Sequence, residues 1–177
     1  YPEYRDSGIE WIGKIPKEWG LSPWRSVLTE RNEKNSKLVT DNILSVTKDR
    51  GVIRYADKGD IGNKSSDRPE NYKIVYPNDI VINSMNLVIG SVGITRELGV
   101  TSSVYLIYRA DKEKVYIDYF HYLIRTVSFQ KYIARFGKGI MELRESIKAD
   151  DLRRQLIAIP PIETQKRIEE YLDEKTT

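Results

Sequence analysis

The sequence predicts an α+β fold in which a mixed, mostly antiparallel sheet comes first and packed helices fill the C-terminal third. Up to residue 109, short aliphatic runs in strand rhythm alternate with Gly, Pro and Asn. From residue 118, apolar residues recur at helical spacing. A last helix after Pro160 and Pro161 carries only a narrow apolar stripe, so we expect it to project towards a coiled coil.

The first half of the chain begins with residues 1–23, which contain six Gly or Pro residues. We expect an extended arm there, pinned by Trp11 and Trp19. Apolar residues at helical spacing predict a short helix over residues 24–31. Between two of the expected strands, Pro77 and Asn78 predict a hairpin-like turn. The strands themselves are expected at residues 42–47, 52–55, 72–76, 79–83, 88–95 and 100–109.

The helices of the C-terminal third have recognisable start and stop signals. Asp118 is a candidate cap for one helix, and Ser128 for another that turns Phe129 and Ile133 inward and ends at Gly137. We expect both helices to pack on the core.

A strand and a final helix complete the chain. The run at residues 156–159 predicts the strand, and Pro161 suits the first turn of the helix. Ile168 and Leu172 lie one turn apart on that helix, whose other faces are polar. With little to bury against, this helix is either a seam awaiting a partner helix or a frayed end, and we favour the seam.

Composition limits the class of protein. At 177 residues, with 40% hydrophobic and 31% charged residues, the chain suits one globular domain. No apolar run approaches the roughly 20 residues of a membrane span, and no leader opens the sequence, so we expect a soluble, cytoplasmic protein. The absence of cysteine excludes disulfides and zinc knuckles. The chain begins with Tyr1, so we expect a portion of something longer.

The most informative segment runs from Asp79 to Thr95. An aliphatic run leads into Asn83, Ser84, Met85 and Asn86, and then into a turn around Ser91 that is flanked by glycines. Asn side chains can both donate to and accept from one base, and glycines allow close backbone approach. The alternative interpretation is a hairpin with a bulge.

Positive charge is concentrated rather than general, because the net charge is only +3. From His121 to Arg154, eight Lys and Arg residues accompany four Asp and Glu residues. The polar stretch from Lys48 to Glu70 holds six cations and five acids, and it is either a solvated loop or a cradle for phosphates.

Patterns typical of catalysis are missing. There is no phosphate-binding or dinucleotide-binding glycine motif, and the Asp-x-Lys pair of metal-dependent nucleases occurs only in the tail, at Asp173. His121 is the only histidine and has no partner for a triad or a zinc site. The Pro160–Pro161 pair lacks the neighbours of an adenine methyltransferase site. We therefore predict no catalytic residue, no metal site and no cofactor.

Several motifs, taken in order, resemble the specificity subunit of type I restriction-modification systems. The resemblance runs from end to end and depends on the combination rather than on any single motif. The motifs are Asp6–Trp19, Ser45–Lys48, Gly51–Ile53, Asn83–Gly93, Ile157–Ile168 and Tyr171–Asp173.

This resemblance implies a division of labour. Such subunits carry two target recognition domains, each of which reads half of a split DNA site, separated by helices that pair as a coiled coil. Methylation and cleavage belong to other subunits. Residues 1–160 would be one recognition domain and residues 161–177 the start of a spacer helix, with Gln165, Ile168 and Leu172 facing a partner helix. Thr164 departs from the Glu usual there, which affects the expected contact with the modification subunit.

The expected partners are double-stranded DNA, the modification subunits and through them the restriction subunit, and a second recognition domain of the same subunit or a second half-subunit. We expect base contacts from the segment of Asn83, Ser84, Asn86 and Ser91. Phosphate contacts are expected from Arg50, Arg54, Lys58, Lys64, Arg68, Lys138, Arg144 and Lys148. The alternatives are a protein-interaction module with little DNA affinity and, less in keeping with the motifs, a stand-alone enzyme.

Overall fold

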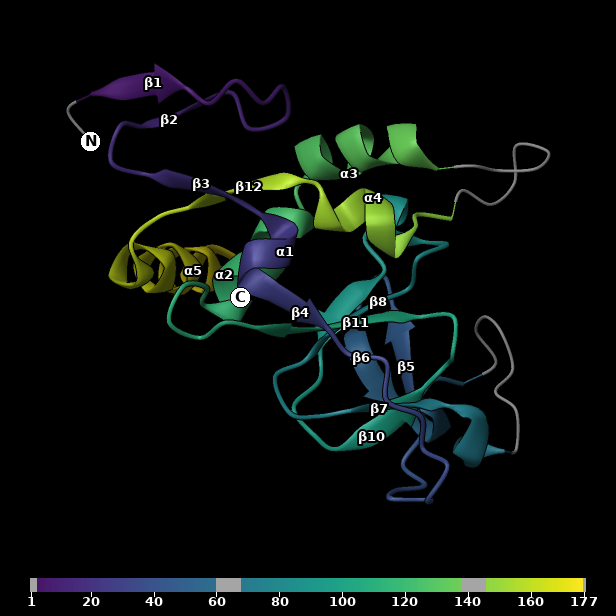
Figure 1. The fold of residues 1–177 in the computed structure, drawn as a ribbon. Coiled ribbons are helices and arrows are strands. Elements are labelled where there is room, and N and C mark those ends of the chain that lie inside the picture. Colours follow the sequence, from purple (N-terminus) through teal and green to yellow (C-terminus); the bar gives the residue numbers. More distant parts are fainter. Residues whose placement is uncertain (1–2, 60–67, 138–145, 177) are drawn as a thin grey trace. The chain divides into compact units, whose positions relative to one another are not determined.

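The computed structural model describes residues 3–59, 68–137 and 146–176 (Figure 1). They form two compact units: unit 1 contains the residues up to Thr29 and from Ala110 onwards, and unit 2 is the continuous segment Glu30–Arg109. The chain passes between the units within β4 (Leu28–Glu30) and at the end of β11 (Leu106–Ala110). This division differs from the boundary expected at residue 160, which concerned the role of the last helix and stays a prediction.

The elements confirm the α+β prediction, because the α-helices described all lie in unit 1 and the strand pairs described are antiparallel. Unit 1 contains β1 (Tyr4–Asp6), β2 (Lys14–Pro16), β3 (Gly20–Pro23), α1 (Trp24–Val27), α2 (Ile117–Ile124), α3 (Val127–Ile133), η4 (Ala134–Phe136), α4 (Ala149–Arg153), β12 (Leu156–Ile159) and α5 (Ile162–Thr176). Unit 2 contains β5 (Leu44–Thr47), β6 (Gly51–Arg54), η1 (Tyr55–Asp57), η2 (Pro69–Asn71), β7 (Lys73–Val75), β8 (Ile80–Ile82), η3 (Leu87–Ile89), β9 (Val92–Ile94) and β10 (Gly99–Thr101).

Aromatic side chains hold unit 1 together. Trp24 is fully buried with its ring centroid 4.9 Å from that of Phe120, and Trp11 lies 5.0 Å from Phe129, both edge to face. The arm is therefore pinned by Trp11 as expected, but it is not merely extended. β1 pairs with β2, and β3 pairs with β12 from the other end of the sequence, as the ribbon shows (Figure 1).

Three local predictions in unit 1 need correction. The helix expected over residues 24–31 ends at Val27, because the chain then continues as β4. The cap of α3 is Thr126 rather than Ser128, since its hydroxyl accepts a hydrogen bond from the Phe129 backbone. Asp118 lies in the first turn of α2 instead of capping it.

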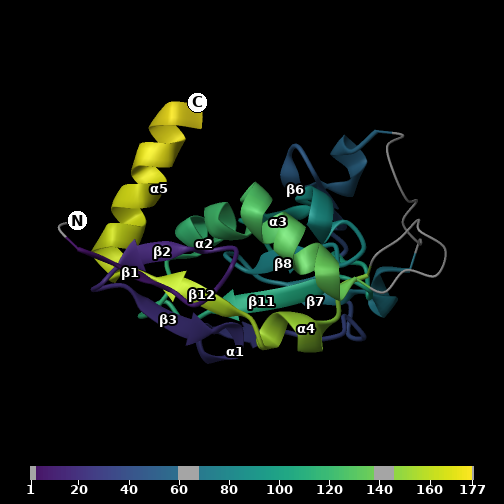
Figure 2. The same ribbon diagram turned by 90° about the horizontal axis from the view of Figure 1, so that it is seen from above.

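The final helix is not left without a neighbour. α5 packs against α2 inside unit 1, so the expectation that it has little to bury against is wrong. Figure 2 shows α5, in yellow, leaving the end of β12 with its C-terminus directed away from that strand. No helix among the described residues has both the length and the apolar character needed to span a membrane.

Aliphatic side chains from several strands form a core in unit 2. The cluster consists of Leu44, Val46, Val75, Val81 and Ile107. β5 pairs with β6, β7 with β10, and β8 lies between β9 and β11.

The strands of unit 2 pair differently from the sequence-based expectation. β7 and β8 flank a turn in which Asn78 is left-handed (φ 71°), but the two strands do not pair with each other, so this is not a hairpin. The runs at residues 88–95 and 100–109 are each shorter as strands, because η3 precedes β9 and a turn separates β10 from β11.

Candidate nucleic-acid interface

The turn between β8 and β9 carries the polar residues predicted to read bases. Asn83, Ser84 and Ser91 are buried, whereas Asn86 is exposed. The Asn83 backbone donates to Ser91 O (3.1 Å), and the Asn83 side-chain oxygen accepts from the Met85 backbone (3.2 Å). The buried side chains are therefore used to hold the turn.

The two serines attach this turn to neighbouring segments of unit 2. Ser84 Oγ donates to Val104 O (3.4 Å), and Ser91 Oγ donates to Val46 O in β5 (3.5 Å). A Cβ on Gly93 would lie 2.6 Å from the Val52 backbone nitrogen, so glycine is needed for this close approach. Asn86 is consequently the one of the four predicted residues that the structure presents at the surface, and its base contact stays a prediction.

The predicted phosphate contacts in unit 2 have varied environments. Arg50 donates to the carbonyls of Asp57 (3.1 Å) and Lys58 (3.4 Å), so it braces the segment after β6. Lys58 is buried beside the Tyr55 ring, with Nζ 5.4 Å from the centroid. Arg68 is exposed next to η2. Lys64, Lys138 and Arg144 lie outside the described residues.

In unit 1 the concentration of positive charge is partly neutralised. Arg135 forms a two-point ion pair with Glu10, with one contact of 2.8 Å, and Arg153 pairs with Asp150 at 3.1 Å. Lys148 is exposed at the start of α4. Of these three cations, Lys148 was the predicted phosphate contact.

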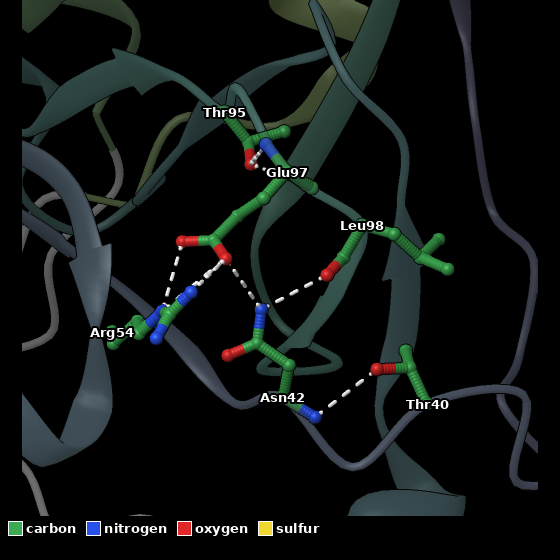
Figure 3. Close-up of polar contacts among 6 residues, drawn as sticks. All are labelled: Thr40, Asn42, Arg54, Thr95, Glu97 and Leu98. Carbon is green, nitrogen blue, oxygen red and sulfur yellow. Dashed lines mark hydrogen bonds and ion pairs between the residues drawn. The ribbon is translucent and has the colours of Figure 1, made fainter.

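Arg54 has a partner that the sequence did not suggest. Its guanidinium pairs with the carboxylate of Glu97, with Nη2 2.8 Å from Oε2, and Asn42 donates to the same oxygen at 3.2 Å (Figure 3). The hydrogen bond from Arg54 lowers the pKa of Glu97 and raises that of Arg54. Glu97 and Asn42 were missed because they are distant from Arg54 along the chain and belong to no motif.

A small polar pocket lies beside the turn. Its volume is about 80 Å³, and burial raises the pKa of Tyr105 in its wall. No motif in the sequence indicated this pocket. Other lining residues include Ser45, Tyr55, Lys58, Tyr72 and Met85.

The predicted partner-helix residues have different environments in unit 1. Gln165 is fully buried: its oxygen accepts from the Tyr116 backbone, and its nitrogen donates to Lys114 O and Pro160 O, all at 2.8 Å. Its side-chain amide is thus hydrogen-bonded within the chain, and its contact with a partner helix stays a prediction.

Ile168 and Leu172 line an apolar groove of about 630 Å³ between α2 and α5. Tyr122 on α2 donates a hydrogen bond to Asp173 on α5, and this bond raises the pKa of Tyr122. Ile168 and Leu172, which were predicted to face a partner helix, therefore border a groove, while the hydrogen bond from Tyr122 connects α2 to α5.

No group of three or more His, Cys, Asp or Glu side chains that could hold a metal ion occurs within the ranges described. The prominent chemistry of unit 2 is hydrogen bonding by amides, guanidinium groups and carboxylates. This arrangement suits recognition of polar edges.

Comparisons with known proteins agree with a recognition role. The family model described as "Type I restriction modification DNA specificity domain" matches residues 16–176. No match was found among the curated proteins.

Three solved structures resemble the fold. The HsdS subunit from Thermoanaerobacter tengcongensis has a TM-score of 0.66 and 13% identity, covering 96% of this chain and 44% of that one. A chain from work on complex assembly and conformational transition of the type I R-M system has a TM-score of 0.61 and 17% identity, with coverages of 98% and 41%. The S subunit from M. genitalium has 0.56 and 16%, with coverages of 88% and 38%. The chain thus spans about two fifths of the length of these proteins.

Proposed function

Because the chain belongs to the family of type I restriction modification DNA specificity domains, we propose that it recognises a specific sequence in double-stranded DNA. It reads one half of a bipartite target, and a second recognition domain or half-subunit reads the other half. Methylation and cleavage are performed by modification and restriction subunits with which it assembles in the cytoplasm. The observation that carries this proposal is the family match over residues 16–176, which includes both compact units.

Unit 2 supplies side chains suited to this task. The turn at residues 83–91 is held by its own buried polar groups and exposes Asn86, whose amide can donate to and accept from adenine. Phosphate contacts come from Arg50, Lys58, Lys64 and Arg68 and, from the part of the sequence after Ala110, from Lys138, Arg144 and Lys148. A fixed turn with an exposed amide suits direct readout, because the turn is already ordered in the free protein and little conformational entropy is lost when DNA binds.

In the proposed assembly, α5 is the start of the spacer helix. Ile168 and Leu172 border the groove on α2, while Tyr171 is exposed on the same helix. A spacer that holds two recognition domains at a fixed separation increases affinity, because the second half-site binds as an intramolecular event.

Selection from a library of randomised duplexes tests the proposal. The 177-residue chain should enrich one short motif. Its affinity for that motif should fall less steeply with salt concentration than its affinity for random duplex. Enrichment of no motif at any salt concentration would exclude sequence-specific recognition by this chain.

A second candidate function is that of a protein-interaction module. The apolar groove beside Trp19, Tyr122 and Leu172 favours it, since such a groove suits a partner helix. Purified modification subunit that binds the chain in the absence of DNA, together with a failed duplex selection, would favour this candidate over the first.

A further inference from the structure

Unit 2 contains a second set of polar side chains, away from the β8–β9 turn, that is organised for hydrogen bonding. Arg54 ends β6, Glu97 lies between β9 and β10, and Asn42 precedes β5 (Figure 3). Arg54 Nε lies 3.2 Å from both carboxylate oxygens of Glu97, and Nη2 lies 2.8 Å from one of them. Their side chains are 61% and 41% exposed, so a ligand can reach them.

Buried groups fix the backbone on which Glu97 sits. Thr95, which is almost fully buried, donates from Oγ1 to Glu97 O (2.8 Å) and accepts from Glu97 N (3.3 Å). The start of β10 passes very close to Asn42, because a Cβ on Gly99 would lie 2.8 Å from Asn42 O. The carboxylate is therefore carried by a rigid turn.

Asn42 is anchored just as firmly. Its side-chain nitrogen donates to Leu98 O (2.9 Å) as well as to Glu97, and its backbone nitrogen donates to Thr40 Oγ1 (3.1 Å). The Thr40 carbonyl in turn accepts a hydrogen bond from the fully buried Asn35. An ordinary exposed ion pair has no such support and loses side-chain entropy when it forms.

The pairing leaves one edge of the guanidinium available. Glu97 occupies the edge formed by Nε and Nη2, while Nη1 has no hydrogen-bond partner among residues 3–59, 68–137 and 146–176. The end formed by Nη1 and Nη2 matches the O6 and N7 acceptors of guanine, the commonest specific arginine contact in the major groove. A phosphate is a poorer ligand for this arginine, because the adjacent carboxylate repels it.

We infer that Arg54 reads a guanine in the DNA target, with Glu97 and Asn42 as positioning residues that present the free edge of its guanidinium. This inference rests on the proposed function, and it replaces the phosphate contact predicted for Arg54 by a base contact. Glu97 also discriminates against misplaced DNA, since any register that brings a phosphate to Arg54 brings it to the carboxylate too.

Arg54→Lys distinguishes a base contact from a phosphate contact, because lysine keeps the positive charge but loses the two-point geometry. In duplex selection with the 177-residue chain, the preference of the variant for guanine at one position should fall about 10-fold or more. The rest of the motif should be unchanged. The slope of log affinity against log salt should stay unchanged, because the number of cations is unchanged. The matched control is Arg153→Lys, which alters an exposed Arg–Asp pair in unit 1 and should leave the motif intact.

Glu97→Gln provides the second measurement. If Glu97 positions Arg54, the same motif position should weaken, while the thermal unfolding temperature stays close to that of the wild type. A uniform gain of affinity for all duplexes, with an unchanged motif, would show that Glu97 only repels DNA and would overturn the inference.

The outcomes separate the two proposals. A wild-type motif that Arg54→Lys leaves intact overturns the guanine contact and preserves the proposed function. A wild-type chain that enriches no motif overturns the proposed function and the guanine contact with it.

Discussion

Unit 1 and unit 2 bury different kinds of side chain. Unit 1 is centred on aromatic pairs such as Trp24 with Phe120, and it contains the described α-helices. Unit 2 has short strands and turns and no described α-helix, and most of the buried polar residues lie there. They are Asn35, Ser45, Lys58, Asp79, Asn83, Ser84, Ser91, Thr95 and Thr101, compared with Ser7, Gln155 and Gln165 in unit 1.

The difference follows from backbone hydrogen bonding. A turn leaves N–H and C=O groups without strand or helix partners, and burying them without partners is costly. In unit 2, polar side chains fill that gap, as Asn35 does for the carbonyls of Thr40 and Pro69. The result is a set of turns whose conformation is fixed by buried polar side chains. Under the proposed function, the exposed residues of these turns serve recognition and unit 1 is the framework.

Gln165→Ala tests the framework and should have the largest effect. Three backbone groups lose their hydrogen-bond partner inside unit 1, and we expect the free energy of unfolding to fall by about 3 kcal/mol or more. Urea unfolding measures the loss. The control Lys166→Gln removes the exposed pair with Glu163 and should leave the unfolding midpoint close to that of the wild type.

Gly93→Ala tests the close approach in unit 2. The new methyl group would meet the backbone of Val52 and Gly51, so we expect destabilisation of about 2 kcal/mol. Amide exchange should show the loss of protection in β5, β6 and β9. Gly20→Ala is the control, because its nearest neighbour would be a carbonyl oxygen at 3.5 Å. Equal loss of protection in α2 and α5 would contradict the description of two separate units.

Sequence patterns predict many of the elements of this fold but not how the elements pair. Buried strands such as β8 and β12, and the final helix, were predicted because their signals are local runs of apolar residues. Pairing partners were not: β7 pairs with β10, and α5 packs on α2, through residues far apart in the chain. Periodicity identifies a strand but carries no information about its neighbour.

The candidate site has the same limitation. A polar cluster such as residues 83–86 reads equally well as a binding surface or as the internal support of a turn, since both use Asn and Ser. The structure presents Asn86 and buries Asn83 and Ser84. The pair of Arg54 and Glu97 had no signal at all, because 43 residues separate the two side chains in the sequence.

Lys148→Gln compares a cation of unit 1, which we expect to contact a phosphate, with Arg54 of unit 2, which we infer contacts a base. Lys148 is exposed in unit 1, and its backbone nitrogen, not its side chain, bonds Asp151 (3.3 Å), so the substitution should leave α4 intact. If Lys148 contacts a phosphate, affinity should fall several-fold for every duplex, and the salt slope should decrease by about 0.9. A change confined to one base position would assign it a base contact instead.

The smallest expected effect concerns two carboxyl groups, one in each unit, whose pKa values shift in opposite directions. The hydrogen bond from Arg54 lowers the pKa of Glu97 below 4.5. Burial, followed by a hydrogen bond with Asp173 and by the charges of Asp118 and Glu170, raises that of Glu169 above 4.5. Carbon-detected NMR titration of the chain should therefore show Glu169 protonating first as the pH falls.

The two shifts have opposite consequences for stability. The contribution of Glu97 is present above the ordinary glutamate pKa of 4.5 and is lost as the pH falls through its lower folded value. Glu169 disfavours folding at neutral pH, and this penalty is relieved as the pH falls through its raised folded value. Arg54→Gln should return the Glu97 midpoint towards 4.5 and leave Glu169 unchanged. Parallel movement of both midpoints would mean that a charge effect common to both units, rather than the local partners, sets the two pKa values.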